Sequence, residues 1–181
     1  MQLKGYTTGT FDRGAPPWKE ALWAIAKGLF FLTPWPLPSR LRVALLRSFG
    51  AKIGEGVVIR ANVNISFPWR LTVGDHVWFG EEVCILSLAP VTIGSHVCIS
   101  QRAFLCTGSH RYRSPRFDLK TAPISVGDSS WIAAQAFIAP GVEIGAGCVI
   151  GAGSVVLESV VAGVLVQGNP AKVTKAIVEE Q

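Results

Sequence analysis

This chain of 181 residues is poor in charge, and its charges are not gathered into one region. Asp, Glu, Lys and Arg together make up 16% of the sequence, and the formal net charge is +5. The basic residues lack the interleaved aromatic residues that are typical of a nucleic-acid-binding surface. We therefore expect no nucleic-acid partner. A positive charge of this size suits an anionic cofactor or an anionic membrane surface.

Long apolar runs and a secretion signal are also missing. The first fourteen residues show no signal-peptide pattern, and Lys27 interrupts the apolar run that follows. A helix that spans a bilayer needs about 20 apolar residues. The four cysteines show no CxxC spacing, so we expect free thiols in a reducing compartment. These absences predict a cytoplasmic protein without a structural zinc site.

The sequence does contain a repeat of six residues. An aliphatic residue recurs every sixth position, and the residue four places after it is small; the aliphatic positions include Ile53, Ile59, Ile93, Ile99, Ile132, Ile138, Ile144, Ile150 and Val156. A period of six does not fit the 3.6 residues of a helical turn, but it fits a short strand plus a corner. Three such units close a triangular coil of about eighteen residues. The sequence therefore predicts an all-β core, a parallel β-helix.

The register of the repeat predicts the length of each coil. Ile53, Val73 and Ile93 hold the same place in successive coils, and each of these coils is slightly longer than three hexapeptides. Val126 and Ile144 are separated by three hexapeptides without an insertion. The interval from Ile93 to Val126 exceeds one coil by about fifteen residues, so an excursion loop leaves the coil at about 109–123.

These intervals divide the chain into three parts. We expect an N-terminal cap at 1–52, a β-helix at 53–166 and a short C-terminal tail at 167–181. Trp69 stands where a small residue is expected, which predicts a deformed face or packing against something outside the coil.

The segment before the repeat reads as an irregular stretch followed by two helices. Residues 17–31 begin with Pro17 in the first turn, and residues 39–49 have Ser39 as the expected N-cap and Gly50 as the stop. We expect these helices to cover the open end of the first coil. Their aromatic residues also allow an interfacial anchor at a membrane; these are Trp18, Trp23, Phe30, Phe31 and Trp35.

Several motifs occur together in a characteristic order. They are Cys106-Thr-Gly-Ser-His110, Val126-Gly-Asp-Ser-Ser-Trp-Ile132, Ile138-Ala-Pro-Gly-Val142, Gly151-Ala-Gly-Ser-Val-Val156 and Gly168-Asn-Pro-Ala-Lys172. From about residue 50 to 177, the chain resembles the hexapeptide-repeat acyltransferases of the maltose and galactoside O-acetyltransferase branch. Over its whole length it is most similar to colanic acid biosynthesis O-acetyltransferases. The resemblance implies a left-handed β-helix, acetyl-CoA as acyl donor, no required metal, and a homotrimer whose sites lie between adjacent β-helices.

The resemblance also implies roles on the acceptor side. The family's histidine falls on His110, where it acts as general base on an acceptor hydroxyl. An imidazole suits this step, because a sugar hydroxyl is a poor nucleophile at neutral pH. A family amide that contacts the acceptor falls on Glu82, which can accept but cannot donate a hydrogen bond as an amide does. His76 and His96 occupy equivalent corner positions in Gly-Asp-His-Val and Gly-Ser-His-Val, so we expect both to be structural.

On the cofactor side, the resemblance implies five further residues. Trp131 falls on a tryptophan near the cofactor, and the backbone at Ala134 and Ala152 falls where the pantetheine arm is bound. Lys172 and Lys175 match two basic residues near the CoA phosphates, where positive charge is useful. One lysine of the family is replaced by Glu158, which weakens a phosphate contact.

We therefore expect an acetyl-CoA-dependent O-acetyltransferase that acts on a sugar hydroxyl in exopolysaccharide or other surface-glycan biosynthesis. Its acceptor is a sugar or a lipid-linked glycan, and the enzyme works in the cytoplasm, with peripheral contact at the inner face of the membrane as an option. An acyltransferase for an amino sugar, a serine or a drug is the main alternative. Two further alternatives remain. A zinc hydratase of the γ-carbonic anhydrase type would need three converging histidines. A scaffold protein without catalytic activity would not bind CoA.

Overall fold

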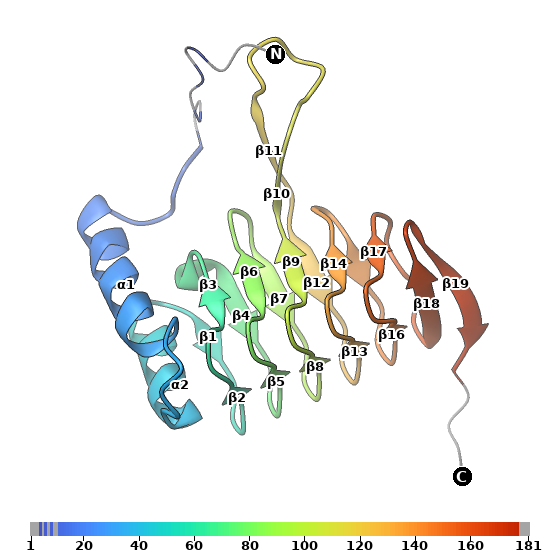
Figure 1. The fold of residues 1–181 in the computed structure, drawn as a ribbon, viewed down its shortest axis with the longest axis horizontal. Coiled ribbons are helices and arrows are strands. Elements are labelled where there is room, and N and C mark those ends of the chain that lie inside the picture. The colour runs from blue at the N-terminus through green and yellow to red at the C-terminus, as the bar shows by residue number, and fades with distance from the viewer. Residues whose placement is uncertain (1–3, 5, 7, 9–10, 178–181) are drawn as a thin grey trace.

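A computed structural model describes residues 4, 6, 8 and 11–177. Its body is a triangular prism made of three parallel sheets, with one strand in each sheet for each coil (Figure 1). The first sheet contains β1 (Lys52–Ile53), β4 (Leu71–Val73), β7 (Val91–Ile93), β12 (Ile124–Val126) and β15 (Glu143–Ile144). The predicted parallel β-helix is therefore present.

The other two sheets follow the same order along the axis. The second sheet contains β2 (Val58–Ile59), β5 (Trp78–Phe79), β8 (Cys98–Ile99), β13 (Trp131–Ile132), β16 (Val149–Ile150), β18 (Val164–Gly168) and the antiparallel β19 (Ala171–Ala176). The third sheet contains β3 (Asn64–Ile65), β6 (Cys84–Leu86), β9 (Phe104–Cys106), β14 (Phe137–Ile138) and β17 (Val155–Val156). The edge between the second and third sheets is called the second corner. The edge between the third and first sheets is called the third corner.

Strand pairing confirms the predicted register. Ile53 lies beside Val73, Val73 beside Ile93, Ile93 beside Val126 and Val126 beside Ile144. The third pair closes across the excursion, so the coil resumes in register after it. In the two longer coils the additional residues lie in the third corner, just before β4 and β7.

The interior of the prism is one continuous hydrophobic core. The aliphatic residue of each repeat is buried, and so are the small residues beside it, among them Ala103, Ala136 and Cys148. Because each coil packs on the next, a buried residue of one coil contacts the equivalent residues of the coils on either side. Each additional coil therefore lengthens the core without widening it.

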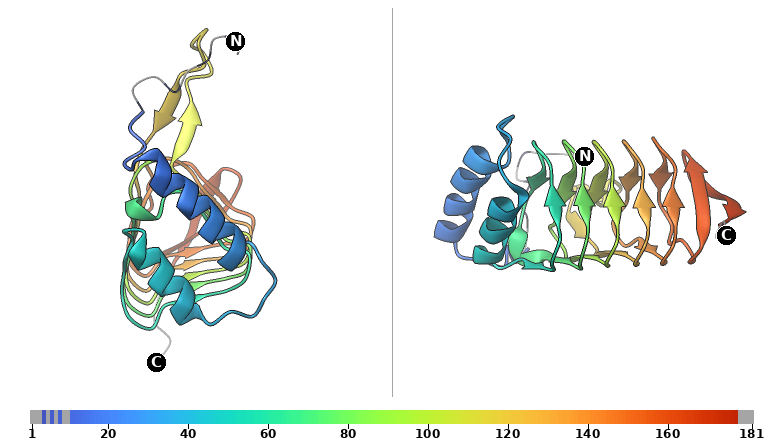
Figure 2. Two further views of the ribbon diagram at one scale, coloured as in Figure 1. Left: turned by 90° about the vertical axis from the view of Figure 1, so that its left-hand side faces the viewer. Right: turned by 90° about the horizontal axis from the view of Figure 1, so that it is seen from below.

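Two helices close the N-terminal end of the prism. They are α1 (Pro17–Phe30) and α2 (Ser39–Ser48), and they lie together across the end of the β-helix (Figure 2). Trp23 is buried there; its Nε1–H donates to the Ile65 carbonyl at 2.9 Å, and its ring meets Phe31 edge-on. The helices therefore cover the open end of the first coil, as predicted.

The N-cap expected at Ser39 is wrong. Pro38 occupies that position, and no side-chain cap is formed. The Ser39 hydroxyl instead exchanges hydrogen bonds with the backbone of Ile59, so it ties the helix to the first coil. Gly50 does end the segment with a φ of 100°, a conformation that glycine adopts at little cost.

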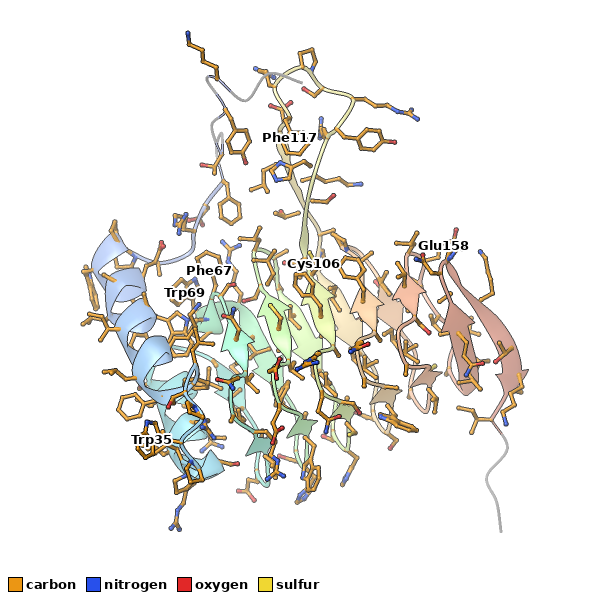
Figure 3. All side chains as sticks on the ribbon, in the orientation of Figure 1. Trp35, Phe67, Trp69, Cys106, Phe117 and Glu158 are labelled. Carbon is orange, nitrogen blue, oxygen red and sulfur yellow. The ribbon has the colours of Figure 1, made fainter. Side chains whose placement is uncertain are left out.

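The position of Trp69 is explained by packing outside the coil. Pro68–Arg70 form a short 3-10 turn, and Trp69 Nε1–H donates to the Arg13 carbonyl at 2.8 Å. The ammonium of Lys19 lies 5.2 Å from the centre of the Trp69 ring. Figure 3 shows Trp69 and Phe67 beside the segment that leads into α1. Trp69 therefore holds the N-terminal segment against the prism.

The excursion is a β-hairpin instead of an irregular loop. Strands β10 (Gly108–His110) and β11 (Leu119–Thr121) pair antiparallel and project from the third corner (Figure 1). Buried Thr107 anchors its base, because its hydroxyl donates to the Leu86 carbonyl and accepts from the Ala89 amide. Within the described residues, neither helix is long and apolar enough to cross a membrane.

Candidate functional site

His110 lies on the hairpin, at the last residue of β10. It pairs with Leu119 of β11, and its side chain is half-buried. The coil ends at β9 just before it, and β10 leads away from the prism (Figure 1). A side chain in this position lies beside the β-helix and is not part of its face.

The imidazole of His110 is fixed in one orientation. Its ring stacks on Phe117, with centroids 4.1 Å apart and an interplanar angle of 7°, and Tyr6 meets it edge-on at 5.7 Å. Nδ1 lies 2.9 Å from the Phe117 carbonyl oxygen. A carbonyl can only accept, so Nδ1 carries the proton, and the neutral ring has its lone pair on Nε2. No hydrogen bond reaches Nε2 from the part of the chain that the structure describes. The geometry therefore leaves a proton acceptor open to a ligand.

Glu82 lies on the second corner and forms an ion pair with a neighbouring side chain. Its carboxylate accepts two hydrogen bonds from Arg102, at 2.8 and 3.1 Å. This pairing lowers the pKa of the Glu82 carboxyl, so the group is ionised at neutral pH. Both side chains are exposed, and an exposed pair of this kind adds little stability. An acceptor sugar would meet a paired carboxylate and guanidinium, not a lone acid.

Glu82 belongs to a row of corner residues in the left-handed conformation. The row runs along the second corner with one member in each coil: Asn62, Glu82, Arg102, Gln135 and Gly153, with φ between 59° and 67°. The φ of each residue directs its side chain outward from the same edge. Side chains in successive coils are therefore neighbours, about 4.8 Å apart along the axis.

Ala134 and Ala152, the two alanines expected to bind the cofactor, lie on this same corner. The Gly153 amide donates to the Ala134 carbonyl at 2.9 Å, which stacks the corner containing Ala152 directly on that containing Ala134. Within the described residues, the amides of Ala134 and Ala152 donate to no acceptor. Trp131 precedes them on β13; it is partly exposed, and its Nε1–H donates to Ser100 Oγ at 2.8 Å. The second corner thus presents two free N–H groups beside a fixed indole.

The two lysines lie on β19, at the C-terminal end of the prism. Both are exposed, and Lys175 pairs with Leu165 across the strands. Lys172 Nζ lies 3.9 Å from a Glu158 carboxylate oxygen, and Figure 3 shows Glu158 near this end. The Glu158 substitution noted in the sequence therefore places a negative charge next to one of the two expected phosphate-binding cations.

The predicted site residues fall into two separate groups. Trp131, Ala134 and Ala152 gather on the second sheet and second corner, together with Glu82, while His110 lies on the hairpin at the third corner. The third sheet separates these two edges, as the view down the axis shows (Figure 2). One chain therefore does not bring the expected base against the expected cofactor surface.

The histidines do not converge either. His76 and His96 stack on each other in successive coils, with centroids 5.1 Å apart, on the edge between the first and second sheets. His110 is on a different edge. Among the described residues, no group of three His, Cys, Asp or Glu side chains is arranged to hold a metal ion.

Three partners of the site residues were not predicted. Glu82 and Arg102 hold the same place in successive coils, so their pairing could have been found from the register. Phe117 and Tyr6 gave no such signal, because both lie outside the repeat. The contact of Phe117 with His110 depends on the turn of the hairpin, and that of Tyr6 on the approach of an N-terminal residue to the hairpin.

Comparisons with known proteins agree with the fold and the motifs. Residues 123–158 match the family model described as bacterial transferase hexapeptide (six repeats). Over 182 aligned positions that cover all of both chains, the sequence is 45% identical to the putative colanic acid biosynthesis acetyltransferase WcaF of Escherichia coli. This identity over the full length confirms the resemblance seen in the motifs.

Two solved structures are similar along most of the chain. A hexapeptide-repeat acetyltransferase from Vibrio cholerae, complexed with acetyl coenzyme A, is 30% identical with a TM-score of 0.81 and covers 99% of this chain and 100% of its own. A galactoside acetyltransferase in complex with coenzyme A is 26% identical with a TM-score of 0.80, covering 90% and 82%. The fold is therefore the predicted left-handed parallel β-helix. The chain belongs to the hexapeptide-repeat acetyltransferases, a family of acyltransferases, and is related to the colanic acid and galactoside enzymes.

Proposed function

We propose that this protein is an acetyl-CoA-dependent O-acetyltransferase that acts on a sugar hydroxyl during the synthesis of a surface glycan in the cytoplasm. The observation that carries the proposal is the hydrogen bond from His110 Nδ1–H to the Phe117 carbonyl. It leaves Nε2 as the unprotonated nitrogen of the neutral ring. The relatives named above support acetyl transfer and a glycan acceptor.

In the proposed reaction, His110 Nε2 takes the proton of the acceptor hydroxyl while the oxygen attacks the thioester carbonyl of acetyl-CoA. A C–O bond forms, and the C–S bond then breaks. The CoA thiolate leaves and recovers the proton from the imidazolium, and the acetyl ester is the second product. The Phe117 carbonyl stabilises the imidazolium, because it accepts from Nδ1–H in both protonation states. No covalent enzyme intermediate is needed.

The cofactor would lie along the second corner. The free amides of Ala134 and Ala152 are one coil apart and can donate to the amide carbonyls of the pantetheine arm. Small side chains at these positions let the arm approach the backbone. Lys172 and Lys175 at the end of the prism would then meet the nucleotide phosphates, with Lys172 weakened by Glu158.

The two groups of residues imply a site shared between subunits. Since the third sheet separates His110 from the second corner in one chain, the His110 hairpin must meet the second corner of a neighbour. A cyclic trimer with its β-helices side by side supplies three such meetings by symmetry. Glu82, on the same corner as the cofactor residues, would then accept a hydrogen bond from the acceptor sugar.

Titration calorimetry with acetyl-CoA tests the proposal without knowledge of the acceptor. We expect saturable binding to the native chain, and binding at least tenfold weaker for the double variant Lys172→Ala, Lys175→Ala, because two charge-assisted contacts with phosphate are lost. The matched control is Lys52→Ala, Arg60→Ala, which removes two exposed charges at the other end of the prism. Absence of binding to the folded native chain would contradict the cofactor assignment. An acceptor screen that finds turnover only with amino sugars would favour N-acyl transfer.

A further inference from the structure

The outer side of α1 carries no charge. Its charged side chains are all turned toward the rest of the chain, where each has a partner: Lys19 lies over the Trp69 ring, Glu20 pairs with Arg13, and Lys27 donates to Asn64 Oδ1. A surface helix normally has the opposite arrangement, with its charges toward water. The polarity of α1 is therefore reversed.

The solvent side of α1 is an unbroken row of large apolar residues. Trp18, Leu22, Ile25 and Leu29 are spaced at helical intervals and are between 50% and 65% exposed. Leu32 and Trp35 extend the row beyond the helix, and Trp35 is 69% exposed. Figure 3 shows Trp35 on the outer end of the molecule. We call these six residues the apolar stripe. An exposed row of this length marks an interaction surface.

The helical cap that carries the apolar stripe has a net positive charge. Residues 17–50 contain five basic residues and one acidic residue, Glu20, which is already paired with Arg13. Three of the five do not reach the outer surface, because Lys19, Lys27 and the buried Arg42 each contact other parts of the chain. Arg40 and Arg47 are exposed on α2, the helix that lies beside α1 across the end of the prism (Figure 2). The Arg47 guanidinium donates to the carbonyls of Ile53 and Gly54, whereas Arg40 forms no side-chain hydrogen bond within the described residues.

We propose that the apolar stripe docks the protein on an anionic phospholipid bilayer, with α1 lying in the plane of the surface and the net positive charge of the cap favouring an anionic surface. Apolar side chains would enter the boundary of the acyl chains, Trp18 and Trp35 would sit at the level of the headgroups, and the exposed Arg40 would meet a lipid phosphate. A helix of 14 residues is only about 21 Å long, so it lies on a bilayer and does not cross it. A second copy of the chain fits less well, because its own cap carries the same net positive charge and would repel.

The position of the apolar stripe fits this orientation. The stripe faces away from the β-helix along its axis, because the opposite side of α1 packs on the first coil through Trp23. In the trimer of the proposed function, cyclic symmetry would place three stripes at the same end, and three weak attachments would act together. The docking rests on that function and extends it, by holding the enzyme where a lipid-linked acceptor lies.

Co-sedimentation of the full chain with vesicles tests the proposal and requires no activity. Vesicles of phosphatidylglycerol and phosphatidylethanolamine are compared with vesicles of phosphatidylcholine. The native chain should sediment with the anionic vesicles, and the variant Ile25→Glu, Leu29→Glu should lose about tenfold or more in partition coefficient. Arg40→Glu should lose roughly fivefold or more on anionic vesicles. The matched control, Leu157→Glu, Val161→Glu, changes two equally exposed apolar residues of the last coil and should bind as the native chain does.

Three results would overturn the proposal. The first is a native chain that stays in the supernatant with anionic vesicles, and the second is a stripe variant that sediments as well as the native chain. The third is a change in molecular mass of the stripe variant by light scattering without lipid, which would make the apolar stripe a contact between subunits. Circular dichroism of each variant confirms that it is folded. Calorimetry with acetyl-CoA is independent of this result, so loss of docking and loss of cofactor binding are separate outcomes.

Discussion

At the scale of single residues, the hydrogen bond between His110 and Phe117 fixes the proton of the proposed base on one nitrogen. The carbonyl determines which nitrogen carries the proton, and the stacked Phe117 ring prevents the imidazole from turning over. His76 and His96 also stack, but on each other, and His96 is exposed on a coil corner. These two histidines therefore provide an internal comparison for His110.

Replacement of His110 by alanine should abolish most turnover. Loss of a general base typically costs a factor of about 10² to 10⁴ in rate. We expect kcat to fall by this amount in an acetyl-transfer assay, with unchanged acetyl-CoA affinity and an unchanged circular dichroism spectrum. His96→Ala serves as the control and should keep native kcat. Activity of His110→Ala within a few-fold of native would exclude His110 as the base.

At the scale of elements, Arg42 joins three parts of the cap. It is only 2% exposed and donates to four carbonyls: those of Phe30 at the end of α1, Trp35 and Leu37 in the connection between the helices, and Ile59 in the first coil. Burial lowers the pKa of its guanidinium, but five N–H donors in a rigid fork can satisfy these acceptors together. The cap therefore depends on one side chain from α2.

Removal of that side chain should loosen the cap. Arg42→Ala leaves several buried carbonyls without a donor, at a cost of about 3 kcal/mol or more in the free energy of unfolding. We expect a lower melting temperature and faster proteolysis between residues 31 and 38. Arg40→Ala, an exposed neighbour on the same helix, should change neither. Equal melting temperatures for the two variants would show that the four hydrogen bonds contribute little.

The success of each prediction depends on whether the sequence signal of that element is repeated along the chain. The strands, the coil lengths and both helices followed from the sequence, because a six-residue period and an apolar pattern are repeated many times. The cap at Ser39 was wrong, since its hydroxyl bonds to Ile59 across the chain. The hairpin was expected only as a loop, because a single excursion carries no repeat. The contact of Tyr6 with His110 joins two segments outside the repeat, so no period could reveal it.

At the scale of the whole molecule, the site is divided between two edges of the prism. His110 and Ala152 lie on opposite sides of the third sheet, so one chain alone cannot place the proposed base beside the cofactor. In the proposed function, this division makes activity a property of the assembly. It can be tested by mixing two chains that are each inactive for a different reason.

A mixture of defective subunits should recover activity. Ala152→Trp adds a bulky side chain at an exposed corner and should block the pantetheine arm without disturbing the core. Neither this variant nor His110→Ala should be active alone. After random co-assembly in equal amounts, about a quarter of the shared sites contain an intact histidine from one chain and an intact corner from the next, so roughly a quarter of native activity should return. No recovery in mixed trimers would show that each chain supplies both parts of its own site.

The left-handed row along the second corner has a consequence for how this enzyme can change. Its five positions share one backbone conformation although they hold an amide, an acid, a base, another amide and a glycine. Because the backbone at this edge accepts such different side chains, a substitution there alters the outer surface and leaves the coil intact. The edge behaves as a linear set of exchangeable positions beside the proposed cofactor surface. Acceptor preference could therefore diverge between relatives, one coil at a time, on a fold that does not have to readjust.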